Sequence, residues 1–355
     1  MKILGIETSC DETAAAVVED GRRILSSVVA SQFDLHRSFG GVVPEVAARA
    51  HVECITAIID EALTSAGCTQ ESIDAIAVVN RPGLVGALLV GVAAAKGLCI
   101  AWEKPLIGVD HIVSHVYASV LAGFTVFPHV SLIVSGGHTS LYRVSDPLSI
   151  TVLGQTADDA AGEAFDKVAK MLNLGFPGGP ALAKLADLAA PEGRTLFCGV
   201  QRSALSPDDG PYAGQEAGSP DFSFSGLKTA VYYHLRGTTH GRGALRNLSE
   251  TERMDVAASF QEAACGILVA KTLAACKREG IRSAAIGGGV ACNMRLRDLF
   301  KVRAALERPP IDVFFPPPEL CTDNAAMSAG LAYHRAQQGV WDTLDLEVDP
   351  TPKRA

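Results

Sequence analysis

The sequence predicts an α/β protein of two lobes that arose by internal duplication. Its 355 residues suffice for two domains, and 48% of them are hydrophobic while 20% are charged, which is typical of a folded globular protein and excludes a disordered chain. Strand patterns alternate with helix patterns, as in layered α/β folds. Two strand–turn–strand units, at residues 3–19 and 130–144, open similar halves of the sequence and indicate the duplication.

The first half begins with an apolar strand over residues 3–8, a small polar turn over 8–13 and a second strand over 14–19. Apolar segments of helical length then alternate with short β-like runs. We expect these elements at residues 45–66 (helix), 74–80 (strand), 84–102 (helix), 106–109 (strand) and 111–122 (helix).

The second half repeats the arrangement with a strand at 130–134, a turn at 135–139 and a return strand at 140–144. The elements expected after it are helices at 159–172 and 255–279, a strand at 283–286, a helix at 290–307, a strand at 313–315 and a helix at 324–338. We therefore predict an N-terminal lobe at 1–122, a C-terminal lobe at 123–340 and a tail at 341–355. Residues 191–221 and 236–250, rich in turn-forming and polar residues, are predicted as surface insertions.

Charge and cysteine content restrict the partners and the compartment. The net charge of −8 excludes a diffuse electrostatic grip on nucleic acid, so an RNA partner needs a local basic patch. Such residues gather at Arg236, Arg242 and Arg246, and at Arg295, Arg297, Lys301 and Arg303. Nine cysteines without a C-x-x-C pair indicate reduced thiols and a cytoplasmic protein. The longest apolar stretch is too short for a membrane span, so we expect a buried helix at 84–100 and no membrane partner.

Three glycine-rich or polar turns are candidate ligand sites. The turn at 8–13 offers three hydroxyls, a thiol and two carboxylates, which suit an anion, a metal or merely a hairpin tip. The turn at 135–139 contains adjacent glycines, which let a phosphate or carbonyl approach the backbone. Residues 287–289 are three glycines between a strand and a helix, where either a nucleotide or tight packing fits, and Asn293 follows one turn later.

His111 and His115 are four residues apart on one predicted helix, so their rings share a face. Two such imidazoles suit half of a zinc or iron site, although H-x-x-x-H is a weak signal. A metalloprotease would need Glu where Ile112 stands. A third ligand must come from elsewhere, and Asp323 is the best candidate, although a helix N-cap is its more ordinary role.

Acidic residues also cluster at the start of the predicted helix 159–172. Asp159, Glu163 and Asp166 share one face by their spacing and would repel each other. They favour either the helix dipole or a cationic or hydroxylated group that meets them.

Together, the segments resemble one family, the TsaD (formerly Gcp/YgjD) proteins, from residue 1 to about 340. The segments that carry the resemblance are Gly5-Ile6-Glu7-Thr8-Ser9-Cys10-Asp11-Glu12-Thr13, Gly40-Gly41-Val42-Val43-Pro44-Glu45, His111 with His115, Val134-Ser135-Gly136-Gly137-His138-Thr139, residues 159–167, Phe222-Ser223-Phe224-Ser225-Gly226-Leu227-Lys228, Gly288-Gly289-Val290 with Asn293, and Cys321-Thr322-Asp323-Asn324. The usual Gly-Pro-Gly of the family is Arg81-Pro82-Gly83 here, and an Asp of many relatives is Ala183.

The resemblance implies a duplicated actin-like fold, shared with sugar kinases and heat-shock ATPases. It implies transfer of a threonylcarbamoyl group from threonylcarbamoyl-AMP to N6 of the adenosine beside the tRNA anticodon, with release of AMP. The implied partners, besides tRNA, are a TsaB-like homologous subunit and a TsaE-like ATPase. Alternatives are a metabolite kinase or ATPase of the same fold, and a non-catalytic scaffold.

The resemblance also assigns the site residues. A divalent metal, Fe²⁺ or Zn²⁺, is expected on His111, His115 and Asp323, in a cleft between the lobes. Asp11 or Glu12 is expected to remove the proton from the adenine amine. The implied donor-binding residues are Ile133, Val134, Ser135, Gly136, Gly137, Asp166, Gly179 and Asn293.

Overall fold

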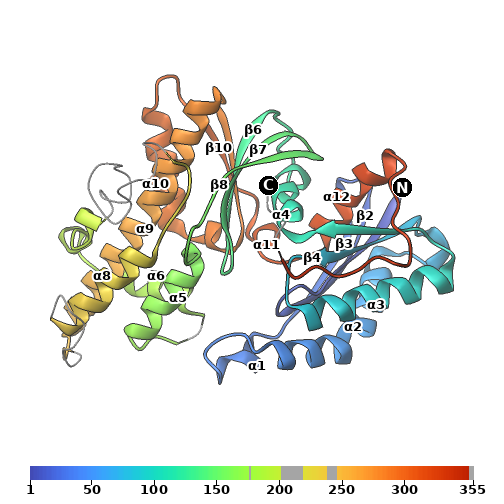
Figure 1. The fold of residues 1–355 in the computed structure, drawn as a ribbon, viewed down its shortest axis with the longest axis horizontal. Coiled ribbons are helices and arrows are strands. Elements are labelled where there is room, and N and C mark those ends of the chain that lie inside the picture. The colour runs from blue at the N-terminus through green and yellow to red at the C-terminus, as the bar shows by residue number, and fades with distance from the viewer. Residues whose placement is uncertain (176, 201–218, 238–245, 352–355) are drawn as a thin grey trace. The chain divides into compact units, whose positions relative to one another are not determined.

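The computed structural model describes residues 1–175, 177–200, 219–237 and 246–351, which form two compact units (Figure 1). Unit 1 contains Met1–Phe127, Val144–Ile150 and Pro316–Ala355, and unit 2 contains Pro128–Arg143 and Thr151–Phe315. The greater part of both predicted insertions, and Arg242 of the predicted basic groups, lie outside the described residues.

Unit 1 is built on a mixed sheet with the strand order β3-β2-β1-β4-β5. The first three strands pair antiparallel, and β1, β4 and β5 pair parallel. Alternate residues serve opposite faces of the sheet: Ile3 belongs to one hydrophobic cluster, and Leu4 and Ile6 to the other. The strands are β1 (Lys2–Glu7), β2 (Glu12–Glu19), β3 (Arg23–Ser31), β4 (Ala75–Arg81) and β5 (Leu106–Asp110).

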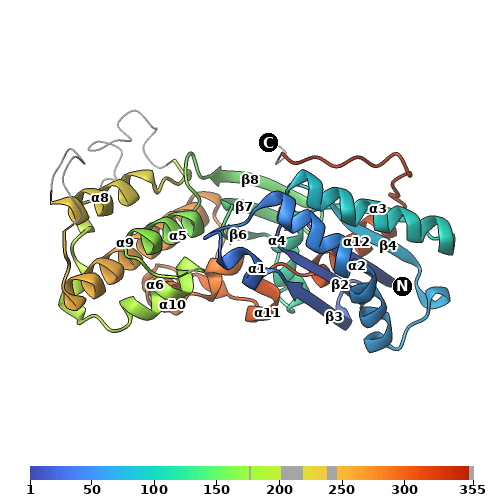
Figure 2. The ribbon, with the colours of Figure 1, turned by 90° about the horizontal axis from the view of Figure 1, so that it is seen from below.

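Helices cover both faces of this sheet, so the central strands read as continuous apolar runs. The last helix, α12, packs on β1, β2, β4 and β5 and against α4, whereas α2 and α3 lie side by side against β2 and β4 (Figure 2). The helices of unit 1 are α1 (Phe33–Arg37), α2 (Pro44–Ala66), η1 (Gln70–Ser72), α3 (Val85–Trp102), α4 (His111–Leu121), α11 (Pro318–Cys321) and α12 (Ala325–Gln337).

The sheet of strands β6 to β10 repeats the same topology and confirms the predicted duplication. Its order is β8-β7-β6-β9-β10, which matches β3-β2-β1-β4-β5 strand for strand, and the pairs β6–β9 and β9–β10 are again parallel. The strands are β6 (His129–Val134), β7 (Thr139–Asp146), β8 (Ser149–Gln155), β9 (Ser283–Gly287) and β10 (Asp312–Phe314).

The long helix α9 is the centre of unit 2, where it packs against β6 and β9 and against α5, α6, α8 and α10 (Figure 1). Ser249 caps its first turn through the N–H of Glu252, and Gly280 ends it in the left-handed conformation. The helices of unit 2 are α5 (Ala161–Met171), α6 (Gly178–Ala186), η2 (Pro191–Arg194), α8 (Ser225–Arg236), α9 (Glu250–Glu279), η3 (Gly289–Cys292) and α10 (Met294–Leu306).

The structure differs from the expected division of the chain at its C-terminal end. The segment Pro316–Ala355 belongs to unit 1 and not to a C-terminal lobe that continues to residue 340. The physical reason is α12, whose apolar residues complete the cluster around Ile3 and Ile107. The segment after α12 is not an unattached tail either, because the N–H of Asp342 donates to the carbonyl of Leu106 and that of Asp349 to the carbonyl of Asn80.

The helix expected to be buried at 84–100 is exposed along one face. Its residues Val85, Leu89 and Ile100 are 53%, 53% and 65% exposed, because only the face that meets the sheet and α2 is covered. By length and composition alone, α3 and the mostly buried α9 would both qualify as membrane spans, which is weak evidence for either.

Close packing of α12 on β1 requires a residue without a side chain at position 5. A Cβ on Gly5 would lie 2.4 Å from the carbonyl oxygen of Ala325 and 2.9 Å from the Cβ of Ala329. We predict that Gly5→Ala lowers the free energy of unfolding by about 1–3 kcal/mol, since overpacking forces the helix away from the strand. Urea unfolding followed by circular dichroism measures this.

Gly97 provides the matched control for Gly5. It lies in α3, is exposed, and an added Cβ would meet nothing within 4 Å. Gly97→Ala is expected to stabilise the protein by about 0.5–1 kcal/mol, because alanine has the higher helix propensity. Equal effects of the two substitutions would contradict the packing argument.

Candidate functional site

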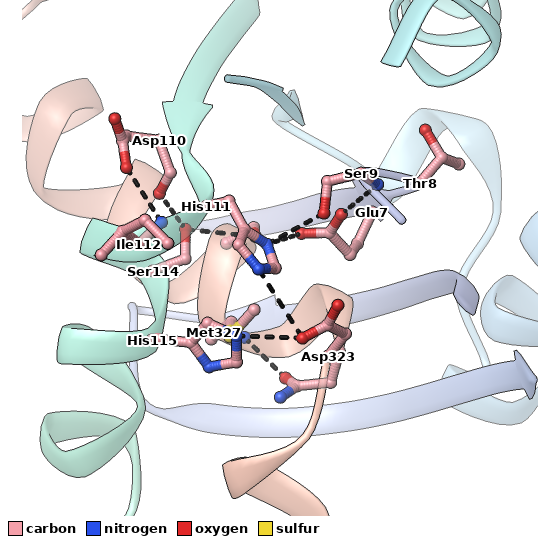
Figure 3. Close-up of polar contacts among 12 residues, drawn as sticks. Glu7, Thr8, Ser9, Asp110, His111, Ile112, Ser114, His115, Asp323 and Met327 are labelled. Atoms are coloured by element: carbon pink, nitrogen blue, oxygen red, sulfur yellow. Dashed lines mark hydrogen bonds and ion pairs between the residues drawn. The ribbon is translucent and has the colours of Figure 1, made fainter. Parts of the chain in front are cut away.

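The junction between β5 and α4 positions two histidines. Asp110 ends β5, and its Oδ1 accepts hydrogen bonds from the N–H groups of Ile112 (2.9 Å) and Val113 (3.1 Å), which caps α4. His111 is therefore the first residue of the helix, and His115 follows one turn later. Their ring centroids are 4.6 Å apart with an interplanar angle of 85°. Figure 3 shows both side chains beside Asp323.

Asp323 meets both rings. Its Oδ1 lies 3.0 Å from Nε2 of His115 and 3.7 Å from Nε2 of His111. The alternative role of Asp323 as an N-cap is filled by Asn324, whose side chain accepts the N–H of Met327 at 3.0 Å. The structure thus brings together the three residues expected to bind a metal, with ligand atoms within 4.8 Å of one another. All three belong to unit 1.

Glu7 orients the first ring. Its Oε2 is 2.9 Å from Nδ1 of His111, and its Oε1 accepts the N–H of Ser9 at 2.6 Å. A carboxylate on Nδ1 keeps the hydrogen there, so the lone pair of Nε2 is available to a cation that replaces the second proton of the ring, the arrangement found around metal-binding histidines. Sequence reasoning did not single out Glu7, although a carboxylate at the end of a buried strand is itself a signal.

The donor set of two imidazole nitrogens and one carboxylate oxygen fits a divalent transition metal. Three protein ligands leave coordination positions open, as in catalytic rather than structural sites. Hard cations such as Mg²⁺ prefer oxygen ligands only, so the two histidines favour Zn²⁺ or Fe²⁺.

The surroundings of the cluster hold an excess of negative charge. Burial lowers the pKa of His111, but Asp323 and Glu7 outweigh burial and raise it to about 9. Burial, together with Asp323 and Asp11, raises the pKa of Glu12 to about 9. Both shifts have the direction expected where negative charge is in excess and a positive charge is stabilised.

The turn at 8–13 lies in the same unit. Cys10, Asp11 and Glu12 are half-buried, and Glu12 is hydrogen-bonded to Asp11. Burial, followed by the charge of Asp11, raises the pKa of the Cys10 thiol far above its usual range, so the thiol is protonated. Nearby, Nε of Arg81 is 3.6 Å from Oδ2 of Asp110.

The second candidate region lies in unit 2 at the end of β6. Ile133 and Val134 are buried, and the N–H of Ser135 donates to the carbonyl of His138 at 2.8 Å, which closes the turn. Gly136 and Gly137 face open space, since an added Cβ on either would meet nothing within 4 Å. Their backbone is therefore accessible to a ligand.

The other three donor-binding residues expected from the resemblance make contacts within unit 2. Oδ1 of Asp166 accepts the N–H of Gly179 at 3.0 Å and so holds the start of α6. Asn293 caps α10 by accepting the N–H of Leu296, and its amide nitrogen donates to Gln261 at 2.8 Å. The helix expected at 290–307 therefore begins only after Asn293. Residues 289–292 form the short helix η3 instead.

Lysines and hydroxyls relieve the acidic cluster. Asp159 lies outside α5, so the stripe of three carboxylates on one helix is not formed. Lys167 and Lys228 are within 2.7 Å and 2.5 Å of its carboxylate. Asp158 accepts hydrogen bonds from the hydroxyls of Ser223 and Ser225. The motif at 222–228 thus ties the start of α8 to the start of α5.

Comparisons with known proteins agree on one family. A family model described as TsaD, tRNA N6-adenosine threonylcarbamoyltransferase, matches residues 23–330. A protein of Symbiobacterium thermophilum with that enzyme name is 50% identical over 349 residues, which cover 98% of this chain and 95% of that protein. One of Moorella thermoacetica is 49% identical over 350 residues, with 98% and 96% covered.

Solved structures with much lower identity share the fold. Full-length HypF in its phosphate- and nucleotide-bound form gives a TM-score of 0.59 at 13% identity and covers 96% of this chain and 47% of HypF. Component A of (R)-2-hydroxyglutaryl-CoA dehydratase from Acidaminococcus fermentans gives 0.52 at 14% identity, with 95% and 99% covered. These similarities confirm the predicted actin-like fold.

The raised pKa of His111 makes metal binding depend on pH. Because the ring is protonated below about pH 9 in the metal-free protein, a bound cation must displace a proton. We predict that the apparent affinity for Zn²⁺ rises about tenfold per pH unit as pH 9 is approached and levels off above it. Competition with a chromophoric chelator measures this. The variant Asp323→Asn should bind Zn²⁺ at least about tenfold more weakly, because it lacks one ligand. A Zn²⁺ affinity of the wild type that does not change with pH would contradict the prediction.

Proposed function

Because the chain belongs to the TsaD family of tRNA N6-adenosine threonylcarbamoyltransferases, we propose that it transfers the threonylcarbamoyl group of threonylcarbamoyl-AMP to N6 of the adenosine beside the anticodon. The bond between the carbamoyl carbon and the AMP phosphate oxygen breaks, a bond from that carbon to N6 forms, and AMP leaves. The adenine amine loses one proton. The observation that carries this proposal is the cluster of His111, His115 and Asp323.

The cluster is proposed to hold one divalent cation, Fe²⁺ or Zn²⁺. His111 and His115 each offer Nε2 and Asp323 offers Oδ1. When bound, the cation supplies positive charge for the oxygens of the donor. Glu7 and Ser9 contact Nδ1 of His111 and keep Nε2 available. The alternative of a kinase or ATPase of the same fold lacks such support, since phosphoryl transfer with Mg²⁺ uses oxygen ligands.

The donor is proposed to bind the backbone of residues 133–137, together with Asp166, Gly179 and Asn293. The open faces of Gly136 and Gly137 support this assignment. Gly288 holds the neighbouring loop against β6, because it has φ +87° and a Cβ there would lie 2.4 Å from the carbonyl oxygen of Val134. Fixed backbone donors of this kind can hold phosphate or ribose without reorganisation.

The acceptor amine is a poor nucleophile, because its lone pair is delocalised into the adenine ring. A carboxylate that accepts its proton therefore assists the attack. Asp11 or Glu12 is proposed for this step. Both lie in the turn that follows Glu7 and Ser9, which contact His111 directly.

We propose that partner subunits supply the positively charged surface that this acidic chain lacks for binding tRNA. Of the predicted basic residues, Arg295 is paired with Glu262 at 2.7 Å and Arg246 with Glu252 at 3.1 Å. The exposed apolar residues of α3 suit a TsaB-like subunit. We also propose a TsaE-like ATPase as a further partner and the cytoplasm as the compartment.

We predict that Leu89→Glu abolishes co-elution with a TsaB-like subunit in size-exclusion chromatography, because it places a charge among the exposed apolar residues of α3. Unchanged co-elution would exclude α3 from the interface.

Transfer by purified protein tests the function. Wild-type protein with Fe²⁺ or Zn²⁺, threonylcarbamoyl-AMP, tRNA and the partner subunits is expected to form the modified adenosine, measured by mass spectrometry of digested tRNA. His115→Ala should lower the rate at least about 100-fold, because loss of a metal ligand removes charge stabilisation. The variants Asp11→Asn and Glu12→Gln should both retain the metal. Only one of them should remove the proton acceptor, and that variant should have a kcat lower by about 100-fold or more.

Lys184→Ala is a control on an exposed position of α6 and should leave the rate unchanged. Full transfer by His115→Ala would exclude the metal mechanism. Phosphorylation of a metabolite from ATP, without transfer to tRNA, would favour the kinase alternative.

A further inference from the structure

Three buried side chains connect the start of α2 to the turn that carries Asp11 and Glu12. They are Gln32, just before α1, His36 in α1, and His51 in α2, and each is at most 5% exposed. None belongs to the metal cluster, and the proposed reaction does not use them. Burial of polar side chains is energetically tolerable only when their hydrogen bonds are satisfied.

The hydrogen bonds among them have a defined direction. The N–H of Val43 donates to Nδ1 of His36 at 3.3 Å, so the ring hydrogen of His36 is on Nε2, which lies 3.3 Å from Oε1 of Gln32. The amide nitrogen of Gln32 donates to Nδ1 of His51 at 3.2 Å. His51 therefore carries its hydrogen on Nε2, 3.0 Å from the carbonyl oxygen of Cys10. Four hydrogen bonds thus run head to tail from Val43 to Cys10.

Other contacts agree with a neutral His51 in this tautomer. The hydroxyl of Thr13 lies 2.7 Å from its Nδ1 and can donate there. Burial lowers the pKa of His51, which keeps the ring uncharged at neutral pH.

At Cys10 the side chain of His51 holds the backbone carbonyl of the turn. The carbonyl of Ser9 accepts the N–H of Leu84 at 2.8 Å, and the carbonyl of Asp11 accepts the N–H of Gln32 at 3.0 Å. Between them, the carbonyl of Cys10 accepts from His51. The orientation of the peptide that joins Cys10 to Asp11 therefore depends on the His51 ring.

We propose that His51 is a positioning residue that fixes the Cys10 carbonyl, and with it Asp11 and Glu12, while Gln32 and His36 impose the tautomer that His51 needs. The proposal rests on the proposed function in one respect, namely that this turn takes part in the transfer. It also gives the motif at 40–45 a physical role, because Val43 is both the N-cap of α2 and the first donor of the relay.

Two substitutions at one position separate the relay from general packing. The amide nitrogen of His51→Gln can occupy the place of Nε2 and donate to Cys10, whereas the shorter His51→Asn reaches only the place of Nδ1. We expect His51→Asn to lower kcat about tenfold, the effect of one buried hydrogen bond, with the KM of the donor and the metal content unchanged. His51→Gln should stay within about threefold of the wild type. His234→Asn, at a half-buried histidine of α8 whose ring contacts Phe197, should leave kcat unchanged.

Nitrogen NMR of the full chain, labelled with ¹⁵N-histidine, tests the relay without activity. Both His36 and His51 should carry their hydrogen on Nε2. In Gln32→Glu the carboxylate cannot donate, so the His51 signals should shift. A hydrogen on Nδ1 of His51, or wild-type kcat in a folded His51→Asn, would overturn the proposal. If the wild type forms no modified tRNA, the proposed function fails and the tautomers alone decide the relay.

Discussion

The candidate metal centre depends on the packing of α12 against β1 and α4. This contact brings Asp323 to two histidines that precede it by more than two hundred residues in the chain, since Asp323 and His115 are separated by 208 positions. The glycine at position 5 permits the approach of strand and helix. Asn324 caps α12, and the carboxylate of Asp323 faces the imidazoles. The candidate metal centre therefore follows from helix packing and from the separate roles of two adjacent residues, since Asn324 caps the helix and Asp323 contacts the histidines.

A second constraint is electrostatic. Glu7 is fully buried beside His111, and Asp323 is only partly exposed. Two carboxylates around one ring are costly to bury unless a positive charge balances them. In the metal-free protein the proton on His111 provides that charge. A cation in its place would provide more, so metal and proton compete for the same position.

Much of the fold and part of the site could be predicted from the sequence. Local patterns suffice for β1, β4 and α4, and the spacing of His111 and His115 gives their shared face directly. The strands β3 and β8 were missed, because mixed polar patterns such as that of β3 are stabilised by pairing with a neighbour. Whether Asp323 or Asn324 caps α12 cannot be read from composition, since both residue types are good caps. The links of Glu7 to His111 and of His51 to Cys10 join distant segments and follow only from the tertiary structure.

The composition of unit 1 from both ends of the chain has a consequence for biosynthesis. The sheet of unit 1 is synthesised before unit 2, but the helix that covers one of its faces is synthesised after unit 2. Unit 2 can complete its core in the meantime, since domains generally fold as they emerge. Until α12 is synthesised, one apolar face of the unit 1 sheet is therefore uncovered, and Asp323 is missing from the candidate metal centre. The cluster of His111, His115 and Asp323 is therefore complete only after Asp323 has been synthesised, and a chain that ends before residue 323 lacks one of the three proposed ligands.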